Sequence, residues 1–179
     1  DFRSGVYMQT LLREPAAGVM HALIYFPFLI LLAVTTVLEV NHQVPESIKF
    51  LHGDVYRAYT AVSDIAGVLY LVGVVWAMLR RYGPPRFRPY RIRIKSKPEH
   101  AAVLLVFLAI GVTGFGAEAF RIALQDSLGG HGAEAETWSV VGYPLAMAIV
   151  GSDWLVGDLA GWHQGWWIAH VTSFMAFLA

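Results

Sequence analysis

Long, predominantly apolar stretches separate short polar segments along this chain. A helix rises 1.5 Å per residue, so about 20 apolar residues are enough to cross ~30 Å of hydrocarbon. Three stretches exceed that length, and a fourth begins near residue 159 and continues to the end of the sequence. We therefore predict membrane helices over about 15–40, 55–80, 100–124 and 159–179.

A shorter uncharged stretch over about 137–152 contains Gly142 and Pro144. It is short for a crossing and is better interpreted as an interfacial or re-entrant helix. The fold class expected is all-α, a polytopic transmembrane helical bundle. Four of its helices are visible, the last one truncated, out of five or more. The sequence starts at Asp1 and stops at Ala179 inside an apolar run, so we interpret residues 1–179 as a single membrane domain, a fragment of a longer chain.

The composition supports a bilayer location. Of the 179 residues 56% are hydrophobic and only 15% are charged, whereas soluble domains carry about 25% charged residues. The chain has no cysteine. It therefore cannot form disulfides, ligate an iron–sulfur cluster through its own thiolates or attach a c-type haem.

The net charge of zero hides an asymmetry. Eight of the 13 Lys and Arg residues lie within 80–97, whereas 125–162 carries five acids and no Lys or Arg. The positive-inside rule places loop 80–99 in the cytoplasm and segment 125–162 outside. The basic loop is expected to set the topology and to contact anionic lipid, or else to dock a cytoplasmic partner. Nucleic-acid binding is not expected of a loop held at a membrane.

Two histidines, His21 and His170, lie inside apolar stretches. A neutral imidazole in hydrocarbon needs a hydrogen-bond partner or a metal. Membrane bundles hold b-type haem between histidines, so haem ligation and hydrogen bonding between helices both remain open. His21 lies in the cytoplasmic half of its helix and His170 in the outer half, which separates them by ~10 Å or more in depth. Two haem levels are therefore easier to build than one.

Two further histidines are candidates for the same sites. His163 stands two helical turns before His170 and on the same face, either near an outer site or at the interface. His100 follows Glu99 at roughly the level of His21. It could pair with His21 across one haem, cap its helix or face water.

Intramembrane charges are costly, which makes Asp64, Glu118 and Arg121 functional candidates. Glu118 and Arg121 are three residues apart and could neutralise each other. In the other interpretation Arg121 holds a haem propionate, while Asp64 or Glu118 exchanges protons with a quinone. Gly111, Gly114 and Gly116 would provide either close helix packing or room for a porphyrin.

Several motifs occur in an order that resembles a known family. They are Gly18-Val19-Met20-His21, Asp64-Ile65-Ala66-Gly67-Val68, Arg80-Arg81-Tyr82, Thr113-Gly114-Phe115 with Glu118 and Arg121, and Trp166-Trp167-Ile168-Ala169-His170. They resemble the membrane cytochrome b of the nitrate reductase gamma-subunit superfamily. The likeness is strongest to its heterodisulfide-reductase-like branch, which includes the membrane part of electron-transfer-flavoprotein:menaquinone oxidoreductases.

The resemblance implies one or two b-type haems and exchange of electrons with menaquinone in a bacterial or archaeal cell membrane. It also implies a cytoplasmic iron–sulfur protein or flavoprotein as partner, with the clusters on that partner or on a missing domain. His21 and His170 fall where family haem ligands fall, but Leu31 stands where the nitrate reductase relatives have a second histidine.

The function expected is therefore that of a haem b-containing membrane subunit. It would transfer electrons between the cytoplasmic partner and the quinone pool. The alternative is a haem-free membrane scaffold or transport subunit whose histidines bond only between helices.

Overall fold

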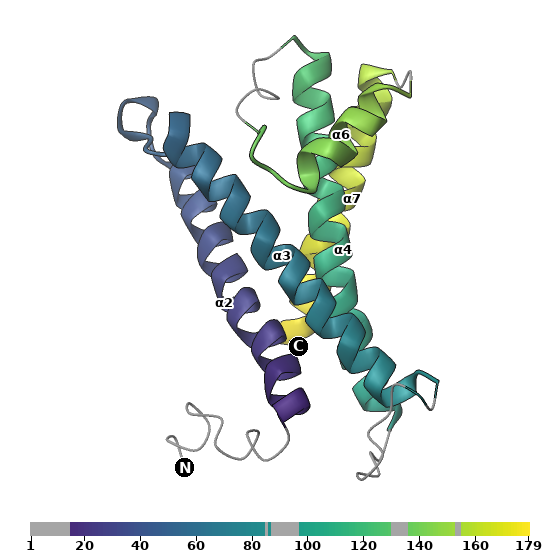
Figure 1. The fold of residues 1–179 in the computed structure, drawn as a ribbon. Coiled ribbons are helices and arrows are strands. Elements are labelled where there is room, and N and C mark those ends of the chain that lie inside the picture. The colour runs from purple at the N-terminus through teal and green to yellow at the C-terminus, as the bar shows by residue number, and fades with distance from the viewer. Residues whose placement is uncertain (1–14, 85, 87–96, 130–135, 153–154) are drawn as a thin grey trace.

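The computed structural model describes residues 15–84, 86, 97–129, 136–152 and 155–179, and this part of the chain is helical (Figure 1). A single-turn 3-10 helix, η2 (Glu46–Ile48), lies between the first two long helices. The α-helices are α2 (Pro15–Gln43), α3 (Gly53–Tyr82), α4 (Pro98–Ser127), α6 (Gly142–Val150) and α7 (Val156–Leu178).

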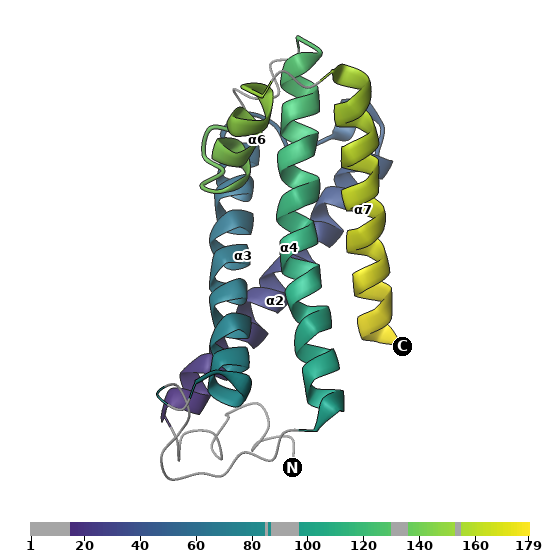
Figure 2. The same cartoon turned by 90° about the vertical axis from the view of Figure 1, so that its right-hand side faces the viewer.

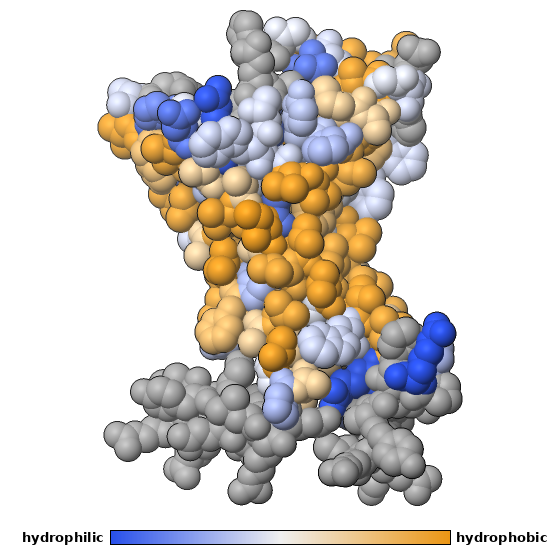
Figure 3. Space-filling view, in the orientation of Figure 1, coloured by the Kyte–Doolittle hydropathy of each residue, from blue (hydrophilic) through white to orange (hydrophobic). Residues whose placement is uncertain are grey.

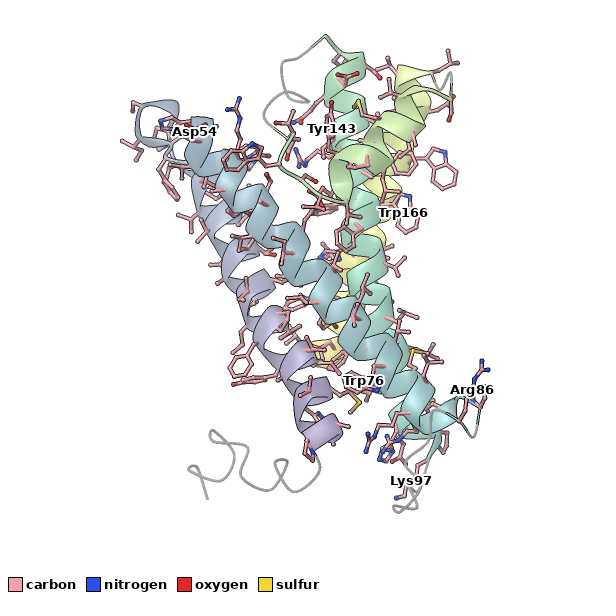
Figure 4. The ribbon with its side chains drawn as sticks, viewed as in Figure 1. Asp54, Trp76, Arg86, Lys97, Tyr143 and Trp166 are labelled. Carbon is pink, nitrogen blue, oxygen red and sulfur yellow. The ribbon has the colours of Figure 1, made fainter. Side chains whose placement is uncertain are left out.

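The long helices form two antiparallel pairs. α2 packs along α3, and α7 packs along α4, while α3 and α4 join the two pairs. Figures 1 and 2 show the pairs crossing, with short α6 lying against α4 at one end of the bundle. We call this the α6 end. The opposite end carries Arg86 and Lys97 (Figure 4) and is called the basic end.

Three described helices are long and apolar enough to cross a membrane, namely α2, α3 and α4. Apolar side chains such as Leu29, Val72 and Leu105 are exposed on their outer faces. In Figure 3 apolar residues form a broad band between two more polar ends. This arrangement suits hydrocarbon, because helices satisfy their own backbone hydrogen bonds and leave only side chains to face lipid. A fourth crossing by α7 stays a prediction, as does the orientation of the bundle.

The observed helices are close to the expected ones and slightly longer. α3 begins at Gly53 and ends at Tyr82, whereas the apolar stretch predicted about 55–80. The short helix expected within about 137–152 is present as α6 over nine residues. The differences arise because backbone hydrogen bonds continue for a turn past the last apolar residue, where helices commonly fray or end.

The glycines of α4 allow close contact between helices. A Cβ at Gly111 would lie 2.5 Å from Leu71 Cδ2, and one at Gly116 would lie 2.5 Å from Trp166 Cδ2. At Gly114 the nearest atom would be His170 Cε1, at 3.3 Å. Each space is thus filled by a neighbouring side chain, which favours the packing interpretation of these glycines.

An aromatic cluster joins the four long helices below the level of α6. It consists of Phe28 from α2, Tyr70 from α3, Phe107 from α4 and Phe177 from α7. Its ring centroids lie 5.3 to 6.3 Å apart. The Tyr70 hydroxyl donates a hydrogen bond to the Phe107 carbonyl at 3.1 Å. The polar atom is thereby satisfied inside the apolar part of the bundle.

Candidate functional site

A buried carboxylate on α3 holds the first turn of α6. Asp64 is 0% exposed, and its Oδ2 accepts hydrogen bonds from Ser139 Oγ at 2.7 Å, from Val141 N at 2.7 Å and from Gly142 N at 3.2 Å. The first N–H groups of a helix have no partner within the helix, and the helix dipole favours a negative charge there. Asp64 therefore binds the amino terminus of α6 as a bound anion would.

A second carboxyl group lies beside the first. Ser139 Oγ is 3.3 Å from Glu118 Oε1 as well as 2.7 Å from Asp64 Oδ2. A hydroxyl has one hydrogen, so Ser139 can donate to only one of the two carboxyl groups at a time. Gly142 makes room for Glu118, since a Cβ there would lie 2.5 Å from Glu118 Cδ. We call Asp64 and Glu118 the carboxyl pair.

Arg121 forms an ion pair with the loop that leads into α6. Its Nη2 lies 2.7 Å from Glu136 Oε1, and Glu136 is only 1% exposed. The Tyr56 hydroxyl donates to the same Glu136 oxygen, and Arg121 Nη1 donates to Gln125 at 3.1 Å. The structure thus pairs Arg121 with Glu136, whereas the sequence suggested Glu118, three residues earlier. A propionate-binding role for Arg121 stays a prediction.

Both candidate histidines of α7 are bonded to the backbone of α4. His170 Nδ1 lies 3.0 Å from the Ile110 carbonyl oxygen, and His163 Nδ1 lies 3.2 Å from the Ala117 carbonyl oxygen. A carbonyl oxygen only accepts, so each Nδ1 carries the hydrogen. In a neutral ring Nε2 then keeps its lone pair. Metal-bound histidines are commonly oriented by such a backbone hydrogen bond.

His21 and His100 line one cavity at the basic end. Its volume is about 570 Å³, and Arg80, Arg81 and Glu99 also contribute to its walls. His21 was expected to be buried in its helix, but its side chain is exposed in the cavity wall. His100 Nδ1 is buried and finds no hydrogen-bond partner among the described residues. An orphaned buried imidazole nitrogen in a cavity of ligand size points to a missing binding partner.

The structure groups most of the predicted residues at the two ends of the bundle. Asp64, Glu118 and Arg121 gather at the α6 end, and His21 and His100 line one cavity at the basic end. Ile110, which bonds His170, is ten residues along α4 from His100, or ~15 Å along the helix axis. This spacing agrees with the two levels expected for His21 and His170.

Sequence reasoning missed Glu136, Ser139 and Tyr56 as members of the site. Glu136 was one of five acids in segment 125–162 and carried no signal that separated it from solvated neighbours. His42 and His52 are exposed, as expected for residues at helix ends. Residues 87–96 of the basic loop, His131 and Trp154 lie outside the described residues.

The described residues hold no group of three or more His, Cys, Asp and Glu side chains that could bind a metal ion. A haem iron differs from such a site, because it needs only one or two axial side chains. The histidines found here are of the type and number that haem requires.

The chain is similar to an EtfAB:quinone oxidoreductase from Syntrophomonas wolfei subsp. wolfei (strain DSM 2245B / Goettingen). The two are 28% identical over 177 residues, which cover 94% of this chain and 23% of the relative. The chain thus spans less than a quarter of that protein. No family model matches the chain, and no solved structure matches it.

Proposed function

We propose that this chain is the membrane part of a quinone-linked electron-transfer oxidoreductase and that it holds b-type haem. The similarity of nearly the whole chain to part of an EtfAB:quinone oxidoreductase supports the quinone-linked reaction. The three long apolar helices support a location in the bilayer, where quinones dissolve. The motifs that resemble the nitrate reductase gamma-subunit superfamily support the haem.

The observation that carries the haem assignment is the hydrogen bond from His170 Nδ1 to the Ile110 carbonyl. It fixes the ring and leaves Nε2 as the nitrogen with a free lone pair, which is what an axial ligand needs. Thr113 Oγ1, 3.2 Å from the same Nδ1, helps to hold the ring. A haem bound here would supply a one-electron carrier within the bundle.

The cavity at the basic end is the proposed site of a second haem. His21 and His100 would provide imidazole nitrogens, and the buried Nδ1 of His100 has no other partner among the described residues. Arg80 and Arg81 line the same cavity and have the charge that propionates require. The aromatic cluster of Phe28, Tyr70, Phe107 and Phe177 would then lie between this haem and the one on His170.

The carboxyl pair suits proton exchange at a quinone. Interconversion of a quinone and its quinol moves two electrons and two protons, so a quinone site needs a group that gains and loses protons. Asp64 Oδ2 already accepts three hydrogen bonds, from Ser139 Oγ and from the backbone N–H groups of Val141 and Gly142. Glu118 lies beside Asp64, 3.3 Å from the Ser139 hydroxyl, and is the group proposed to carry the proton.

The partner proposed for the basic end is a cytoplasmic iron–sulfur protein or flavoprotein. This chain has no cysteine to ligate iron–sulfur clusters. The similar EtfAB:quinone oxidoreductase is more than four times as long as the segment that matches this chain. With loop 80–99 in the cytoplasm, electrons would pass between that partner and the haem in the cavity at the basic end. Segment 125–162 and the carboxyl pair would then lie on the outer side.

One alternative is favoured by a specific observation. The hydrogen bonds of His163 and His170 to α4 could by themselves be the purpose of these residues, joining α7 to α4 in a haem-free scaffold or transport subunit. In hydrocarbon such bonds satisfy the imidazole without any metal.

Haem content of the purified protein separates the two functions. We expect a b-type spectrum in the reduced-minus-oxidised difference, and loss of part of it in His170→Ala. His42→Ala, whose side chain is exposed at the end of α2, is the matched control and should keep all haem. A protein that folds without haem, or a His170→Ala variant with full haem content, would favour the scaffold.

A further inference from the structure

An apolar groove runs along the bundle between the carboxyl pair and His170. Its volume is about 420 Å³, within the range of small-molecule sites. Every long helix except α2 contributes to it, together with α6. The walls include Val68 and Leu71 of α3, Val112 and Phe115 of α4, Leu145 of α6 and Trp166 of α7. We name it the Trp166 groove.

The carboxyl pair lies within one helical turn of residues that line the Trp166 groove. Asp64 lies one helical turn before the wall residue Val68, and Glu118 lies one turn after the wall residue Phe115. Val141 joins the two features directly, because its backbone N–H binds Asp64 while the residue itself lines the groove. A molecule in the groove therefore has a proton-exchanging group within a turn of its end.

The wall formed by α7 leads to the candidate redox centre. Trp166 lines the groove and stands one turn before His170 on the same face of α7. Its indole is packed on Gly116, where a Cβ would lie 2.5 Å from Trp166 Cδ2. Figure 4 shows Trp166 beside the crossing of α6 over α4.

The indole nitrogen of Trp166 is a second observation that points to a ligand. Trp166 Nε1 is buried and finds no acceptor among the described residues. A buried N–H without an acceptor carries a desolvation cost that a bound carbonyl oxygen would remove. Because neighbouring atoms cover Nε1, it can donate to a carbonyl oxygen in the groove only if the indole turns.

We propose that the Trp166 groove binds the ring of a prenylated quinone, with Trp166 Nε1–H donating to one quinone oxygen and Glu118 at the other end of the ring. This inference rests on the proposed function, which supplies the quinone. A quinone fits better than an acyl chain. A hydrocarbon chain has no oxygen to accept a hydrogen bond from the indole and exchanges no proton with a carboxyl group. Flat aromatic walls from Phe115 and Trp166 also suit a planar ring.

The test is direct binding of a naphthoquinone with one isoprenoid unit to the full-length protein in detergent micelles. Bound naphthoquinone is extracted from the separated protein and quantified across a concentration series. Trp166→Phe keeps an aromatic ring over Gly116 but removes the N–H donor. We expect its dissociation constant to rise about five- to tenfold, the value of one hydrogen bond. Trp167→Phe, at a neighbouring position that is 55% exposed, is the control and should bind as the wild type does.

A second variant tests the groove without depending on the indole. Val112→Phe fills the groove from a position that is 45% exposed, so the bundle itself has room for the larger side chain. We expect it to weaken binding more than tenfold. Val75→Phe, 43% exposed and outside the groove walls, should leave binding unchanged.

The outcomes distinguish the inference from the function on which it rests. If the wild type binds the naphthoquinone and both Trp166→Phe and Val112→Phe bind it equally well, the groove assignment is wrong while the quinone-linked function stands. The same conclusion follows if Val112→Phe changes only the amount of co-purified phospholipid. If the wild type binds no naphthoquinone at all, the proposed function fails together with the groove.

Discussion

The Asp64 carboxylate on α3 accepts a hydrogen bond at 2.7 Å from the backbone N–H of Val141, 77 residues later in the chain. This contact fixes the start of α6 against the middle of the bundle. It also explains why an acidic residue is retained in an apolar helix, since the charge meets the unpaired N–H groups of a helix terminus. The site at the α6 end is built on this contact.

Replacement of Asp64 should therefore loosen α6. In Asp64→Asn the negative charge is lost, and an NH2 group, which cannot accept a hydrogen bond, replaces one of the two carboxylate oxygens. We expect the free energy of unfolding to fall by roughly 1–3 kcal/mol, measured by denaturant titration in micelles. Asp54→Asn is the matched control, because Asp54 forms only an exposed ion pair with Arg57. Equal stability of the two variants would contradict the role given to Asp64.

The pair formed by Arg121 and Glu136 should show strong coupling. Glu136 is only 1% exposed, and removal of either partner leaves the other charge poorly compensated, at a cost of roughly 3–5 kcal/mol. The double variant Arg121→Met with Glu136→Met should be less destabilised than the sum of the single variants. Additive losses in a double-mutant cycle would mean that the ion pair seen here does not form in the membrane.

Gly142 is expected to tolerate no side chain. A Cβ there would lie 2.5 Å from Glu118 Cδ and 2.8 Å from Ser139 Oγ. Gly142→Ala should displace Glu118 and lower the midpoint of thermal unfolding, whereas Gly165→Ala, with nothing within 4 Å, should leave it unchanged or raise it. Identical midpoints for Gly142→Ala and the wild type would show that Glu118 does not pack there.

Asn41 is predicted to hold the connection between α2 and α3. Its Oδ1 accepts the backbone N–H groups of Phe50 at 2.9 Å and Leu51 at 3.0 Å. Loss of both bonds in Asn41→Ala should cost about 2 kcal/mol and expose the connection to protease. Gln43→Ala removes only an exposed bond to Glu39 and serves as the control. Equal cleavage rates would contradict this assignment.

The two haem levels predict separable losses. His21→Ala and His100→Ala should each remove the haem of the cavity at the basic end. His170→Ala should remove the haem bound at His170. A redox titration of haem absorbance would then show one component missing in each variant, and the same component missing in His21→Ala and His100→Ala. Loss of both components from every variant would indicate a single shared site.

The sequence predicted the helices well because hydrophobic length is a local property. The stretch expected over about 100–124 became α4, and the polar residues within it were recognised as costly. The sequence alone could not predict that Arg121 forms an ion pair with Glu136, because this contact depends on where the segment before α6 lies against α4. The contacts of Glu118 with Ser139 and Gly142 were not predictable either, because they depend on the packing of α6 against Asp64, a contact between residues far apart in the sequence. The pairing of His21 with His100 was among the open alternatives, and only the packing of α2 on α3 and of α3 on α4 brought both residues to one cavity.

The proposed function requires that this bundle carries haem and that the haem exchanges electrons with a quinone. The most direct measurement is the absorbance spectrum of the oxidised purified protein before and after anaerobic addition of a naphthoquinol. We expect the quinol to reduce a b-type haem in the wild type, and to reduce it less in Glu118→Gln. A preparation of folded protein with no haem absorbance, or with haem that the quinol leaves oxidised, would contradict it.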